Sequence, residues 1–99
     1  MTIVASVAQP RFSSGLVLMT CGVENLVQQG RLNPAPYLCR HFSGDWGDLS
    51  DSDKRQNNAA LKSGEARLFS SYQVSPKLTL WIITEWDRSV TTLLLPDEY

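Results

Sequence analysis

The stretch HFSGDWGD, residues 41–48, holds the side chains best suited to chemistry. It contains the single histidine of the chain, one of its three tryptophans, two aspartates and two glycines. An imidazole exchanges protons near neutral pH, carboxylates accept protons or bind cations, and glycines allow tight turns. Two interpretations are open for this stretch: a turn anchored by Trp46, or the rim of a binding site.

Three sets of polar residues form a candidate site if the fold brings them together. The first set comes from residues 41–48, the second is Asn57, and the third surrounds a predicted hairpin turn at residues 84–92. In a tight hairpin the residues before and after the turn lie opposite each other. The candidate residues are His41, Ser43, Asp45, Trp46, Asp48, Asn57, Thr84, Glu85, Asp87, Arg88, Thr91 and Thr92.

Each candidate also has a purely structural interpretation. His41 fits a hydrogen-bonded residue at the edge of the core, and Trp46 fits a core side chain beneath a glycine turn. The acidic residues and Arg88 fit turns, caps or a local ion pair of little energetic value. Asn57 differs because it stands one helical turn before Leu61, on the face expected to point inward. A buried amide needs partners, since an unpaired one costs about 1–3 kcal/mol.

Catalytic templates fit this sequence poorly. It has no GxSxG, HExxH or GxxxxGK[ST] motif. His41, Ser43 and Asp45 are too close in one loop to form a catalytic triad. A metal site from His41, Asp45, Asp48 and Glu85 has suitable ligand atoms, but the spacing is not diagnostic. We therefore expect no catalysis, no metal and no cofactor. The alternative is a small hydrolase or nucleotide-binding protein centred on His41, Asp45 and Glu85.

Composition excludes several classes of partner. The net charge is −1 and the basic residues are scattered, so no stripe is present to neutralise nucleic-acid phosphates. No apolar stretch is long enough to span a membrane, and the N-terminus lacks the features of a signal peptide. Cys21 and Cys39 form no CxxC pair. We expect two buried free thiols, with a disulfide as the alternative, in a cytoplasmic protein.

Local signals predict three short helices between residues 20 and 64. Thr20 is placed to cap the first helix, and Gly30 to end it. Pro34 suits the first turn of the second helix, which runs into the stretch 41–48. Ser50 is placed to cap the third helix, and Gly64 to end it.

The last third of the chain alternates with the period of strands. Residues 67–74, 78–83 and 90–95 are predicted strands joined by short turns. The middle strand is apolar on both faces, which is typical of a central strand. The predicted fold is α+β, with two or three short helices packed on one face of a three- or four-stranded antiparallel sheet. Residues 1–14 are expected to be an N-terminal extension, and residues 15–99 a single domain.

Four stretches resemble a group of small proteins carried by bacterial plasmids and other mobile elements. They are YLCRHFSGDWGDL, DKRQNNAAL, LFSSYQ and WIITEWDRSVTTLLLPDEY. The associated pattern is HxSGDWG, a later asparagine on a polar helix, SxY, and WIITExDRxxTTxLLPxEY. The resemblance covers residues 37–99, and residues 1–36 do not follow it.

The resemblance implies a passenger of a mobile element that counters host defence. The partners it implies are a host defence protein or a small nucleotide signal, and a homodimer is compatible with the sequence. The resemblance gives no mechanism. The residues it carries over are His41, Ser43, Asp45, Trp46, Asn57, Ser71, Tyr72, Glu85, Asp87, Arg88, Thr91 and Thr92. We therefore expect a small non-catalytic binding protein.

Overall fold

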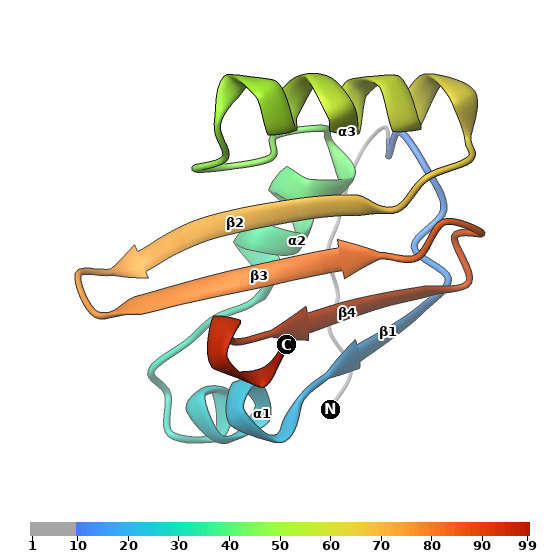
Figure 1. The fold of residues 1–99 in the computed structure, drawn as a ribbon. Coiled ribbons are helices and arrows are strands. Elements are labelled where there is room, and N and C mark those ends of the chain that lie inside the picture. Colours follow the sequence, from blue (N-terminus) through green and yellow to red (C-terminus); the bar gives the residue numbers. More distant parts are fainter. Residues whose placement is uncertain (1–9) are drawn as a thin grey trace.

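A computed structural model describes residues 10–99 of the chain and shows three helices beside one sheet (Figure 1). This arrangement confirms the predicted α+β class. The elements in chain order are β1 (Leu16–Met19), α1 (Cys21–Gln28), α2 (Ala35–Phe42), α3 (Asp51–Ser63), β2 (Leu68–Ser75), β3 (Leu78–Thr84), β4 (Val90–Leu94) and the 3₁₀ helix η1 (Pro96–Glu98).

The sheet has four strands in the order β1-β4-β3-β2. β2, β3 and β4 form the predicted antiparallel meander, with β3 between its neighbours. β1 pairs with β4 in parallel, Leu16 lying opposite Val90, so the sheet is mixed rather than wholly antiparallel. Parallel neighbours need a long connection, and here that connection contains all three helices and the other two strands.

The helix ends follow the local signals in the sequence. The Thr20 side chain accepts a hydrogen bond from the backbone N–H of Val23 at the start of α1. Ser50 does the same for Asp53 in α3. Gly64 ends α3 in the left-handed conformation, with a φ of 71°. Such caps pair backbone groups that a helix leaves without intrahelical partners.

The main core lies between the sheet and the helices α1 and α2, and α2 lies behind the sheet in Figure 1. Its buried members are Val23, Leu32, Leu38, Phe42, Tyr72, Leu80, Ile82 and Leu93. α3 instead runs beside β2 (Figure 1), where Trp46, Ala60 and Leu68 form a second cluster. The sheet face opposite α2 is called the outer face below, and Phe69 and Trp81 lie on it.

Residues 11–14, which precede β1, contact the rest of the domain. The backbone N–H of Arg11 donates to the carbonyl of Phe42 at 2.8 Å. The Phe12 ring meets His41 edge-on, with 5.3 Å between ring centroids. Residues 11–14 therefore belong with the domain rather than with the extension predicted over residues 1–14. Residues 1–9 of the predicted extension lie outside the described residues.

Cys21 and Cys39 are not joined by a disulfide. Cys21 is exposed, however, and Cys39 is half-buried, so the prediction of two buried thiols was wrong. Cys21 opens α1 at the surface, while the inward face of that helix is taken by Val23. Within residues 10–99, no helix has the length and apolar character needed to cross a bilayer.

Candidate functional site

His41 stands at the centre of a buried chain of hydrogen bonds. Its Nδ1 lies 2.5 Å from the hydroxyl of Ser70, and its Nε2 lies 2.9 Å from the hydroxyl of Thr84. Thr84 in turn lies 2.8 Å from the hydroxyl of Thr91, which donates to the carbonyl of Ser14 at 2.7 Å. The network ties α2 to three strand segments and to the chain before β1.

The hydrogen bond from Thr91 to the carbonyl of Ser14 fixes the position of every proton in this network. A carbonyl only accepts, so Thr91 uses its single hydrogen on Ser14 and must accept from Thr84. Thr84 therefore has no hydrogen left for His41, and the Nε2–H of His41 donates to it. The Nδ1 of a neutral imidazole is then an acceptor, and it takes the hydrogen of Ser70. Every donor in the network has an acceptor.

His41 is also shut off from solvent. Its side chain is fully buried, and so are those of Ser70, Thr84 and Thr91. Burial lowers the pKa of His41 to about 3, because the charged imidazolium would lose its hydration without gaining a carboxylate partner. His41 is therefore neutral at physiological pH and serves as a hydrogen-bonded core residue. This agrees with the structural interpretation of His41 given above.

Residues 46–48 lie along β2 as a short piece of parallel strand. The N–H of Ser71 donates to the carbonyl of Trp46 at 3.2 Å, and the N–H of Asp48 donates to the carbonyl of Ser71 at 2.7 Å. The carboxylate of Asp48 accepts the N–H of Gln73 at 2.9 Å. These bonds occupy outward-facing backbone groups of β2, an edge strand.

Asn57 closes the same edge one step further along β2. Its amide nitrogen donates to the carbonyl of Phe69 at 2.5 Å, and its amide oxygen accepts the N–H of Phe69 at 3.2 Å. The side chain is 5% exposed. The prediction that Asn57 faces inward and is paired is confirmed. Asn57 and residues 46–48 together seal the β2 edge.

Trp46 and Tyr72 hold this loop against the domain. The Trp46 indole is 3% exposed, and its N–H donates to the side-chain oxygen of Asn58 at 3.0 Å. The Tyr72 hydroxyl donates to the carbonyl of Asp45 at 2.6 Å, and burial raises the pKa of Tyr72. Trp46 thus anchors a turn, one of the two interpretations of the stretch.

Asp45 and Ser43 point to the surface and form hydrogen bonds with residues nearby in the sequence. The Asp45 carboxylate forms a bidentate contact with Arg40, at 2.7 and 3.3 Å, and accepts the N–H of Gly47. The hydrogen bond from the Arg40 guanidinium holds the pKa of Asp45 below its usual range. The Ser43 hydroxyl donates to the carbonyl of Cys39. Neither side chain is a hydrogen-bond partner of the imidazole, whose two nitrogens pair with Ser70 and Thr84.

The polar residues of the hairpin between β3 and β4 have different hydrogen-bond partners. Asp87 accepts the N–H and hydroxyl of Ser89 within the turn, which lowers the pKa of its carboxyl group. Arg88, at a φ of 60°, donates to the carbonyls of Ala66 and Ala60 and so caps the end of α3. Cations suit this end of a helix.

Two hairpin residues lie away from the His41 network. Glu85 is exposed, and its side chain makes no hydrogen bond with the residues that the structure describes. Thr92 is half-buried opposite Ile83, on the outer face of the sheet. The fold therefore joins His41 to Thr84 and Thr91, but leaves Asp45 and Glu85 apart from it. Among residues 10–99, no group of three metal-ligating side chains is assembled.

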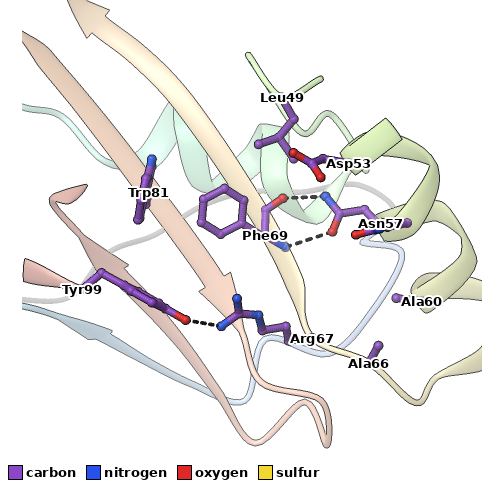
Figure 2. A pocket seen from close by; sticks show the side chains of 10 residues that line it. Leu49, Asp53, Asn57, Ala60, Ala66, Arg67, Phe69, Trp81 and Tyr99 are labelled. Atoms are coloured by element: carbon purple, nitrogen blue, oxygen red, sulfur yellow. Dashed lines mark hydrogen bonds between the residues drawn. The ribbon is translucent and has the colours of Figure 1, made fainter. Parts of the chain in front are cut away.

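A pocket of about 460 Å³ opens between α3 and the outer face of the sheet. Figure 2 shows Phe69, Trp81 and Tyr99 on one side and α3 on the other. Of the predicted site residues only Asn57 lines it. The full lining is Leu49, Asp53, Gln56, Asn57, Ala60, Ala66, Arg67, Phe69, Trp81 and Tyr99.

The pocket combines an aromatic wall with charged groups. Trp81 meets Phe69 and Tyr99 edge-on, with ring centroids 5.0 and 5.9 Å apart. Arg67 donates to the Tyr99 hydroxyl at 2.6 Å. The side chains of Asp53 and Gln56 form no hydrogen bond with other described residues. Sequence reasoning missed this site, although the alternation of β2 and β3 already puts Phe69 and Trp81 on one face.

Comparison with known proteins gives no match to a family model, to a curated protein or to a solved structure. The assignment to a mobile-element family stays a prediction from the motifs. The geometry of the pocket is the remaining guide to function.

Proposed function

We propose that this protein is a non-catalytic binding protein that holds a nucleotide in the pocket between α3 and the outer face of the sheet. The pocket itself carries the proposal. Its volume of about 460 Å³ lies within the range of roughly 300–1,000 Å³ typical of small-ligand sites. By contrast, the hydroxyl and imidazole groups around His41 are buried and already paired, which disfavours the hydrolase alternative.

The lining matches the chemistry of a nucleotide. A base can stack on an aromatic side chain, a contact worth about 1–3 kcal/mol per base. The carboxylate of Asp53 and the amide of Gln56 can accept base N–H groups. The guanidinium of Arg67, which uses Nη1 on Tyr99, has further donors for a phosphate. Aromatic, acidic and basic groups thus line the same pocket.

Such a protein would act by withdrawing its ligand from solution. In a mobile element, as the sequence motifs imply, it would lower the free concentration of a nucleotide signal used by a host defence system in the cytoplasm. This role needs affinity and abundance but no catalytic group, so it does not depend on the imidazole of His41, which is buried and already paired.

Calorimetric titration with the four ribonucleoside monophosphates and their nucleosides tests the proposal. We expect Arg67→Gln to weaken nucleotide binding by about tenfold or more, as the loss of a charge-assisted contact does, while nucleoside binding changes little. Arg55→Gln removes the same charge from an exposed residue of α3 outside the pocket lining and serves as the control. The absence of binding by all eight compounds, or equal losses in the two variants, would contradict the proposal.

A further inference from the structure

The two edges of the sheet differ in whether their outward backbone groups are hydrogen-bonded. At the β2 edge, Asn57 and residues 46–48 occupy the outward backbone groups of Phe69 and Ser71. At the β1 edge, no described residue pairs with the outward groups of Val17 and Met19, because β1 has β4 as its single partner there. An unpaired edge is a template for another strand.

The side chains of β1 add to this asymmetry. Leu16 is 62% exposed and Leu18 is 45% exposed, both on the outer face, whereas Val17 and Met19 pack on the core. Natural edges that stay unpaired are usually protected by lysine, proline or an inward charge. Residues 15–20, GLVLMT, contain none of these.

We infer that β1 is a homodimer interface, in which β1 of a second copy pairs antiparallel with it across a twofold axis to form one continuous sheet. A twofold axis at the centre of the strand brings the central residue next to its own counterpart, so a charged residue there would meet a like charge. The lack of charge on β1 removes that penalty for a second copy. The pocket lies at the β2 side of the sheet and stays open in such a dimer.

One register pairs all the free backbone groups of Val17 and Met19 in both copies. Val17 and Met19 carry the free backbone groups, so Val17 of one copy exchanges both hydrogen bonds with Met19 of the other, and the reverse. Leu18 then faces Leu18 of the second copy across the axis as a non-hydrogen-bonded pair, with Cα atoms about 4.5 Å apart. The two Leu16 residues lie roughly 13 Å apart, since four residues of strand separate their positions.

Cysteine cross-linking of the full chain tests both the dimer and its register. In a Cys21→Ser background, Leu18→Cys should form an intermolecular disulfide under mild oxidation, because its Cα separation fits a disulfide. Leu16→Cys is the matched control: this position is more exposed, yet it is too far from its counterpart. We expect cross-linking at least about tenfold faster for Leu18→Cys than for Leu16→Cys, as this difference in Cα separation requires.

Measurements without added cysteines provide an independent readout. Sedimentation of the unmodified chain should show a concentration-dependent dimer, and Leu18→Lys should abolish it while the chain stays folded. Protection of the Val17 and Met19 amides from hydrogen exchange should increase with protein concentration. A chain that stays monomeric, equal cross-linking at the two positions, or protection independent of concentration would overturn the inference.

Discussion

The side-chain amide of Asn57 pairs with the backbone of Phe69 as a neighbouring strand would. It donates to the carbonyl at 2.5 Å and accepts from the N–H at 3.2 Å. One side chain thereby satisfies both outward groups of an edge residue, which explains why a polar residue occupies the inward face of α3. A carboxamide is suited to this task because it carries a donor and an acceptor side by side.

Asn57→Asp should destabilise the fold by about 2 kcal/mol, because the donor to Phe69 is lost and a charge is buried. The loss should be smaller near pH 4 than at neutral pH, since burial raises the pKa of the new carboxyl group. Urea unfolding at the two pH values measures both effects. Asn58→Asp is the control: Asn58 is exposed and uses its oxygen to accept from Trp46, a role that a carboxylate keeps. Equal midpoints for the two variants would contradict the pairing.

His41 should make stability depend on pH. Its ordinary pKa of 6.5 falls to about 3 in the folded protein, so between these values the unfolded chain binds more protons. Stability from this group is therefore complete above pH 6.5 and is lost as the pH falls toward 3. At about pH 5 the expected loss is on the order of 2 kcal/mol relative to neutral pH.

Nuclear magnetic resonance can follow His41 directly, because it is the single histidine in the chain. The imidazole nitrogen shifts should show a neutral ring protonated at Nε2, without titration between pH 7 and about 5. A folded-state midpoint near the ordinary value would contradict the buried, fully paired network.

Trp46→Ala should destabilise the protein by on the order of 3 kcal/mol, as large truncations in a core do. The indole is 3% exposed and contacts the rings of Phe12 and His41. Trp86→Ala is the control, because that side chain is 62% exposed, and its effect should stay within about 0.5 kcal/mol. Thermal or urea unfolding compares the two. A wild-type midpoint for Trp46→Ala would instead leave this tryptophan facing a ligand.

Gly47→Ala should be more harmful than Gly30→Ala. Both glycines have positive φ, 78° and 72°, so an alanine at either position is strained by about 1–2 kcal/mol. At Gly47 the new Cβ would also overlap the backbone oxygen of Ser71, whereas at Gly30 it would meet nothing within 4 Å. We expect Gly47→Ala to cost on the order of 3 kcal/mol. Similar unfolding midpoints would show that residues 46–48 can leave β2 without loss.

The sequence by itself determined the elements whose signals lie within one turn or one strand. Thr20, Ser50 and Gly64 set helix ends through bonds to residues at most four positions away. Alternation identified β2, β3 and β4, and the helical period placed Asn57 on an inward face. These signals survive folding because the groups that satisfy them are close in sequence.

Tertiary structure alone decided which distant groups meet. The parallel pairing of β1, the partners of His41 and the pocket beside α3 all join residues far apart in the chain. The type of a residue indicates that it needs a hydrogen-bond or packing partner, but it does not identify that partner. The stretch 41–48 shows this best: its side chains suggested chemistry, while in the fold their bonds bury an imidazole and seal a sheet edge. Long-range packing selects among partners that are equivalent in local terms.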